Sequence, residues 1–128
     1  MGTCVTALVA GFALLGGTAV AQGQNGVCED GEFCAFRQIN FDWAADFTTS
    51  DVDWSNNEYP LHAGYPVDDS SSSWFNATVC TATIYSGQGR TGSAITIDAG
   101  ADLPDLRYVY RDPDSDWNNV ASGHVISC

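Results

Sequence analysis

Short stretches in which apolar and polar residues alternate recur along the chain and predict β-strands. The alternation is clearest at residues 80–85 and 93–97. Clusters such as Ser86-Gly87-Gln88-Gly89 mark turns between these stretches. After residue 21 no window keeps the apolar stripe of an amphipathic helix. We therefore expect an all-β sandwich or barrel. The clearest predicted strands are 33–36, 80–85, 93–97, 106–110 and 124–127.

Residues 1–21 carry no charged side chain and are mostly apolar, which is typical of a signal peptide. They end in Ala19-Val20-Ala21, a small-x-small pattern that a signal peptidase recognises. The alternative is a membrane anchor, but an anchor needs about 20 strongly apolar residues, and glycine and threonine dilute this stretch. The basic residues that usually begin a signal are missing. We expect cleavage before Gln22 and a secreted, extracellular protein.

Cleavage there would remove Cys4 and leave Cys28, Cys34, Cys80 and Cys128. An even set of cysteines in a secreted protein indicates disulfides, and four cysteines allow three pairings that sequence alone does not distinguish. We favour Cys28–Cys34, which closes a short loop, and Cys80–Cys128, which ties the chain end to a central strand. A zinc site is disfavoured, because the chain has no Cys-x-x-Cys pair and its two histidines stand in no ligand spacing.

The chain repeats itself once, at an offset of about 50 residues. Each copy has an aromatic-led hairpin followed by a polar loop. The matching positions are Phe36 with Tyr85, Trp43 with Gly92, and 68–73 with 118–123. Units of this size are too small to bury a core alone. We therefore expect the two units, about 28–78 and 79–128, to pack together as one domain over residues 22–128.

The polar loop of each copy resembles the calcium motif of βγ-crystallin domains, (Asn/Asp)-(Asn/Asp)-x-x-(Ser/Thr)-Ser. Residues 68–73 match it at every specified position, and 118–123 depart from it at Gly123. Trp43 stands where the first hairpin should have its fold-back glycine, so we expect that hairpin to be bent or longer. The resemblance implies a disulfide-bonded βγ-crystallin-like double Greek-key sandwich. Its candidate calcium ligands are Asp68, Asp69, Ser72, Asn118, Asn119 and Ser122.

Calcium prefers carboxylate, carbonyl and hydroxyl oxygens, which such loops supply. An aspartate- and serine-rich stretch is also typical of an ordinary solvated loop. The sequence is compatible with both a calcium-binding loop and an ordinary solvated loop.

A nearer resemblance is to secreted bacterial metalloproteinase inhibitors of the same fold, peptidase inhibitor family thirty-six. It rests on the Cys-x(5)-Cys start at 28–34 and on the closing Trp-Asn-Asn-x-Ala-Ser segment at 117–122. The resemblance covers about Cys28 to Cys128. It implies that the partner is an extracellular proteinase, with a metalloproteinase favoured, and that a rigid surface loop blocks it.

The junction between the two copies is the candidate reactive loop. Val79 is apolar and adjoins Cys80, and thermolysin-type metalloproteinases favour apolar side chains next to the scissile bond. Val79 and Cys80 are therefore the candidates for the reactive bond, although a strand entering the core has the same pattern. Trp74 and Phe75 are further candidates for proteinase contact as exposed anchors. Core filling is the commoner fate of such aromatic residues.

Charge and motif content narrow the function further. Sixteen acidic against four basic residues give a net charge of −12, so neither nucleic acid nor a membrane is an expected partner. The chain has no Gly-x-Ser-x-Gly, His-Glu-x-x-His or P-loop motif, and we expect no enzyme. We expect a monomeric proteinase inhibitor that requires no cofactor. The alternative is a calcium-binding βγ-crystallin-type structural module.

Overall fold

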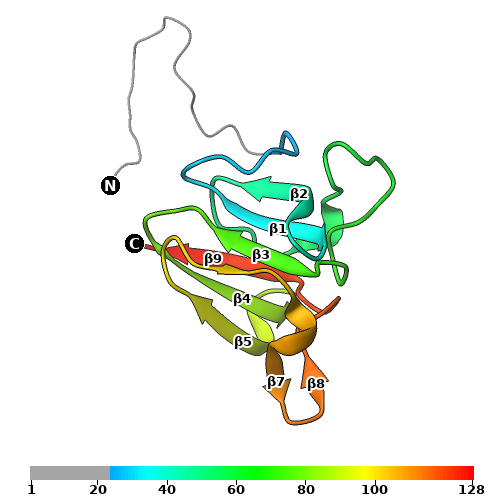
Figure 1. The fold of residues 1–128 in the computed structure, drawn as a ribbon, viewed down its shortest axis with the longest axis vertical. Helices are drawn as coiled ribbons and strands as arrows, with labels where there is room; N and C mark the ends of the chain where they lie inside the picture. Colours follow the sequence, from blue (N-terminus) through cyan, green and yellow to red (C-terminus); the bar gives the residue numbers. More distant parts are fainter. Residues whose placement is uncertain (1–23) are drawn as a thin grey trace, which may run out of the picture.

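The computed structural model describes residues 24–128, so the expected signal peptide, residues 1–21, lies outside the described residues. Two antiparallel sheets pack against each other (Figure 1), with strand orders β2-β1-β3-β6 and β5-β4-β9, and β7 and β8 form a separate ribbon. The strands are β1 (Phe33–Gln38), β2 (Asp42–Phe47), β3 (Ser73–Asn76), β4 (Thr81–Gly87), β5 (Thr91–Ile97), β6 (Asp102–Leu103), β7 (Tyr110–Asp112), β8 (Ser115–Asp116) and β9 (Gly123–Ser127). The 3-10 helices are η2 (Trp54–Asn56) and η3 (Leu106–Tyr108).

The core lies between the two sheets and is formed by alternate residues of their strands. Phe33 and Ala35 of β1 face Ala82 and Ile84 of β4 within one buried cluster. This alternation is the period of two that the sequence showed. The predicted all-β sandwich is confirmed. Among residues 24–128, no helix has the length and apolarity required to span a membrane.

Each half of the chain contributes a segment to the sheet of the other half. The short strand β6 pairs with β3, where Trp74 lies opposite Leu103. Reciprocally, Asp51 forms a bridge with His124 of β9. Because of this exchange, the two sheets are joined by backbone hydrogen bonds as well as by the core.

The expectation of a bent or longer first hairpin is wrong. The turns of the two hairpins match, with Gln38 opposite Asp42 in the first and Gly87 opposite Thr91 in the second. The second hairpin also has a register shift between Tyr85 and Gly87, whereas the pairing of the first runs from Phe33 to Gln38 in one register. Trp43 adopts a φ of 64°, close to the 79° of Gly92. A bulky residue in this left-handed region costs about 1–2 kcal/mol. The first hairpin therefore forms the same turn with a strained tryptophan in place of glycine.

The predicted strand at 106–110 is also wrong. Residues Leu106–Tyr108 form η3, because the Asp105 carboxylate accepts a hydrogen bond from the Arg107 backbone N–H at 3.1 Å and so caps the turn. Leu106 is fully buried and anchors the turn in the core. A short apolar run bounded by turn residues does not distinguish a strand from a buried turn.

Candidate functional site

The turn between β3 and β4 presents one apolar side chain to solvent. Val79 is 55% exposed, whereas Thr78 and Cys80 on either side of it are buried. The start of the turn is also tied to the segment before β1, because the Ala77 N–H donates to the carbonyl of Glu32 at 2.9 Å. The sequence-predicted reactive pair, Val79 and Cys80, therefore lies in a turn whose neighbouring residues are anchored.

The side chain of Asn76, which is fully buried, holds this turn from within. Its Nδ2 donates to the carbonyl of Cys80 at 2.8 Å and to that of Ile97 at 3.1 Å. Its Oδ1 accepts from the Thr78 hydroxyl at 2.6 Å, and that hydroxyl accepts from the Cys80 N–H at 3.1 Å. These bonds fix the backbone around Val79, so that little conformational entropy remains to be lost on docking. Sequence reasoning gave neither Asn76 nor Thr78 a role in this turn, although their Asn-x-Thr spacing lies just before Cys80.

Two disulfides flank the turn without spanning it. Cys28 is bonded to Cys34 and Cys80 to Cys128, which is the pairing that we favoured. The bond between Val79 and Cys80 divides the chain into two parts, and each disulfide lies within one part. Hydrogen bonds and the shared core therefore hold the two sides of this peptide bond together.

Trp74 is not the exposed anchor considered above. Its side chain is fully buried and packs edge-on against Trp117, with ring centroids 5.5 Å apart. Its Nε1 donates to the Ser71 hydroxyl at 2.9 Å. Phe75, the next residue of β3, points to the opposite side of the sheet because neighbouring side chains on a strand alternate, and it is half-buried.

The structure brings the two polar loops together as a reciprocal pair. The Asp69 N–H donates to the carbonyl of Ala121 at 3.0 Å, and the Asn119 N–H donates to that of Ser71 at 2.9 Å. Asp69 and Asn119 both adopt the left-handed conformation, with φ of 57° and 63°. The Ser122 hydroxyl further donates to Asp69 Oδ1 at 3.1 Å, so the loops are linked through side chains as well.

Two buried oxygens at matching places in these loops lack a hydrogen-bond donor. Asp68 Oδ1 and Asn118 Oδ1 are each shielded from solvent and have no hydrogen-bond partner among residues 24–128. Buried polar atoms usually have a partner. A carboxylate oxygen and an amide oxygen in this state are suited to a hard cation such as calcium, which binds oxygen ligands. These oxygen ligands therefore suit calcium, the ion that the sequence motif implied.

The electrostatics of the two loops differ in one respect. Arg37 lines a polar surface hollow together with Asp69, Ser72 and Asn119. The matching residue of the second copy is Ser86, which carries no charge. Burial, followed by repulsion from the charge of Asp68, raises the pKa of the Asp69 carboxyl. A cation beside Asp69 would offset both the burial and the repulsion from Asp68. Arg37, however, would repel a cation that entered the hollow that it lines.

A third group of carboxylates, which sequence reasoning missed, lies beneath the N-terminal segment. Ligand atoms of Glu29, Glu32 and Asp46 lie within 4.8 Å of one another. The Glu29 N–H donates to Glu32 Oε1 at 2.7 Å, and the Gly26 N–H donates to Asp46 Oδ1 at 2.8 Å. These carboxylates fasten the segment to the first sheet. Glu29 and Glu32 are close in sequence, but Asp46 joins them only because β2 pairs with β1, so no sequence motif indicated the group.

The chain matches a known protein family in sequence. The family model described as peptidase inhibitor family I36 matches residues 21–97, which is more than half of the chain. No curated protein matches the chain in sequence.

Solved structures of βγ-crystallin domains are similar in fold. The chain is similar to the structure reported as "Evolution of the eye lens beta-gamma-crystallin domain fold", with 18% identity, a TM-score of 0.58, and coverage of 87% of this chain and 93% of that one. It is also similar to spherulin 3a from Physarum polycephalum, with 19% identity, a TM-score of 0.56, and coverage of 80% and 87%. A βγ-crystallin from Ciona intestinalis has 15% identity, a TM-score of 0.54, and coverage of 76% and 100%. The predicted βγ-crystallin-like double Greek-key sandwich is confirmed.

Proposed function

The chain belongs to peptidase inhibitor family I36, and from this we propose that it is a secreted inhibitor that blocks metalloproteinases with the turn around Val79. The observation that supports the proposal most is the combination of one exposed apolar side chain with a backbone held by buried hydrogen bonds. A turn of this kind is pre-organised for an active site.

In this proposal the Val79 side chain enters an apolar subsite of the proteinase, next to the scissile bond. The zinc ion of the proteinase would polarise the carbonyl at that bond. If water then hydrolyses the bond between Val79 and Cys80, the new carboxylate and amine stay close, because Asn76 still holds the Cys80 carbonyl. The ends are therefore placed to rejoin, and the protein acts as an inhibitor rather than as a substrate or an enzyme.

Inhibition assays test this proposal directly. The purified protein is incubated with a thermolysin-type metalloproteinase, and with a subtilisin-type serine proteinase for comparison, and peptide hydrolysis is followed. We expect inhibition near a one-to-one molar ratio for the metalloproteinase. Full activity of a panel of metalloproteinases at about 100-fold molar excess of the protein would remove the proposal.

A second candidate function, calcium binding, is favoured by the unpartnered oxygens of Asp68 and Asn118. Their side chains, with Asp69, Asn119 and the hydroxyls of Ser72 and Ser122, are the candidate ligands of two related sites. Calcium bound there would neutralise the repulsion between adjacent carboxylates of a chain with a net charge of −12. The ion would thereby strengthen the contact between the two loops.

Thermal unfolding in calcium and in a chelator tests this second candidate. A ligand that binds only the folded state must raise the melting temperature by mass action. We expect a rise at millimolar calcium that is reduced in Asp68→Ala and kept in full in Asp112→Ala, an exposed aspartate outside both loops. An unchanged melting temperature in the unmodified protein would exclude a functional calcium site.

A further inference from the structure

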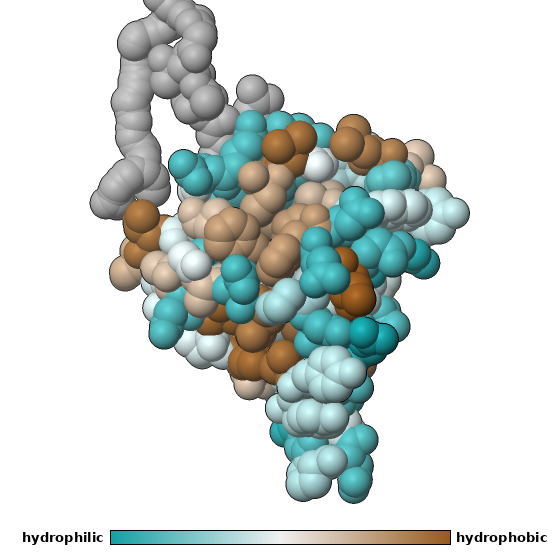
Figure 2. Space-filling view, viewed as in Figure 1, coloured by the Kyte–Doolittle hydropathy of each residue, from teal (hydrophilic) through white to brown (hydrophobic). Residues whose placement is uncertain are grey.

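The outer face of the first sheet is aromatic, although the outward face of a two-sheet sandwich is usually polar. Phe36 and Phe41 pack edge to face with ring centroids 5.4 Å apart, and Phe41 lies 6.4 Å from Phe75. The outer face of the second sheet instead pairs Thr83 with Thr96 across β4 and β5. In Figure 2 a tan-to-brown area lies over β1, β2 and β3 on the side facing the viewer.

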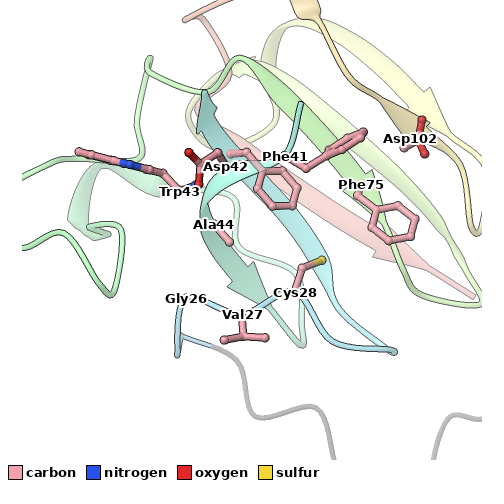
Figure 3. Close-up of a pocket in the computed structure, with 10 residues that line it drawn as sticks. Gly26, Val27, Cys28, Phe41, Asp42, Trp43, Ala44, Phe75 and Asp102 are labelled. Atoms are coloured by element: carbon pink, nitrogen blue, oxygen red, sulfur yellow. The ribbon is translucent and has the colours of Figure 1, made fainter. Parts of the chain in front are cut away.

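These rings border a shallow hollow of about 510 Å³. Figure 3 shows Phe41 in its middle, with Trp43 and Asp42 on one side and Phe75 on the other. Val27, which is 52% exposed, forms its lower edge, and Leu61, 67% exposed, packs on the neighbouring Gly26. Exposed apolar surface therefore continues from Phe75 across the hairpin to Leu61. A contiguous patch of this kind is typical of an interaction site.

The hairpin tip keeps its aromatic residues in an unfavourable backbone conformation. Phe41 and Trp43 have φ of 65° and 64°, and both line the hollow. The matching hairpin has Arg90 and Gly92 in the same conformations. Strained residues persist where the surrounding structure holds them, and they are commonest at functional sites. The fold therefore does not require aromatic residues at these two positions, because the second hairpin has arginine and glycine there.

The charges around the hollow are negative. Asp42 and Asp102 are exposed and belong to its lining, on opposite sides of Phe41. Among the described residues the lining set includes no arginine, and Arg37 contacts Trp43 without lining the hollow. A second copy of the chain is a poor occupant, since each copy has a net charge of −12 and the two faces would repel each other.

From this combination we propose that the hollow is a docking surface for an extended segment of a partner protein that carries an apolar side chain beside lysine or arginine. The apolar side chain packs against Phe41 and Phe75, and its cationic neighbours lie near Asp42 and Asp102. Aromatic residues at the centre of a patch and opposite charges at its rim are the features that give protein interfaces their affinity and their selectivity. The proposal goes beyond inhibition, because its residues are not those of the Val79 turn.

Nitrogen-15 NMR titration of the purified protein tests this proposal without any proteinase. The probe is a blocked Gly-Lys-Phe-Lys-Gly peptide, and the comparison peptides have glutamate in place of both lysines or serine in place of phenylalanine. We expect shifts confined to the amides around Phe41, Phe75 and Asp102, with a dissociation constant on the order of 1 mM. Raising the salt from about 20 mM to about 500 mM should weaken binding several-fold.

The decisive variant is Phe41→Asn, because asparagine tolerates the left-handed conformation. We expect it to weaken binding at least about tenfold, whereas Arg90→Asn, at the matching position of the other hairpin, should bind as the unmodified protein does. Phe75→Thr is the second variant, and a dispersed spectrum shows that each one is folded. Equal binding by Phe41→Asn, equal binding of the glutamate peptide, shifts elsewhere, no binding, or self-association that depends on Phe41 would each overturn the proposal.

Discussion

His124 is expected to make the stability of the protein depend on pH. Its ring is buried, and it stacks on Phe33 with ring centroids 4.8 Å apart. Nδ1 accepts a hydrogen bond from the Trp54 Nε1–H at 3.0 Å, and Nε2 lies 2.9 Å from the carbonyl of Thr49. Because the tryptophan can only donate, the ring must be neutral and carry its proton on Nε2. A second proton on Nδ1 would meet the donor of Trp54.

Burial accordingly lowers the pKa of His124 from 6.5 to about 4. As pH falls below 6.5, the unfolded chain takes up a proton that the folded chain refuses, so the free energy of unfolding decreases. The contribution is complete above the unfolded pKa and is lost progressively between pH 6.5 and about 4. The full difference is about 3 kcal/mol, of which about 2 kcal/mol is lost at about pH 5.

Urea unfolding followed by tryptophan fluorescence at about pH 7 and about pH 5 measures this loss. Most carboxylates stay charged at both values, so the second histidine of the chain, His62, is the main control. We expect His62→Gln to keep the decrease of about 2 kcal/mol. Equal stability at both values, or a decrease that disappears in His62→Gln, would refute the assignment to His124.

Three further outcomes are expected. Calcium titration monitored by calorimetry should show one strong site and one weaker site. Arg37→Ser should strengthen the weaker site, because it removes the cation that lines the same hollow as Asp69. Two equal sites in the unmodified protein would contradict this. Replacing both cysteines of the Cys80–Cys128 disulfide by serine should lower the free energy of unfolding by about 4 kcal/mol, and the same change at Cys28–Cys34 should lower it by about 2 kcal/mol. The difference arises because the two disulfides span 48 and 6 residues. Urea unfolding of both variants measures the two losses, and the reverse order would contradict this prediction. Asn76→Ala should lower the free energy of unfolding by about 3 kcal/mol, because it leaves buried carbonyls unpaired. It should also speed amide hydrogen exchange around residue 79. Unchanged exchange would show that the Asn76 side chain does not hold the turn.

Sequence reasoning succeeded where a physical requirement is local. Alternation predicted β1, β4, β5 and β9, and the cysteine spacing favoured the disulfides that the structure contains. The 50-residue offset predicted that the two polar loops are equivalent, and their reciprocal hydrogen bonds follow that equivalence. It failed at 106–110, where the Asp105 side chain caps a buried turn.

What sequence reasoning could not provide depends on contacts between distant residues. Trp74 and Phe75 are neighbours, yet one fills the core and the other lies on the outer face, and only the register of β3 against β1 decides which. The strain at Trp43 likewise appears only when its backbone is compared with that of Gly92. The clamp of Asn76 on the turn requires the fold that brings β5 beside it.

The inhibition constant of the Val79→Asp variant tests the central proposal most directly. A carboxylate in place of an exposed apolar side chain should leave folding intact, because Val79 is 55% exposed. We expect its inhibition constant for a thermolysin-type metalloproteinase to rise at least about 100-fold, which corresponds to about 3 kcal/mol. Tyr108→Ala, another exposed position, should inhibit as the unmodified protein does. Undiminished inhibition by Val79→Asp would contradict the assignment of the turn as the part that enters the proteinase.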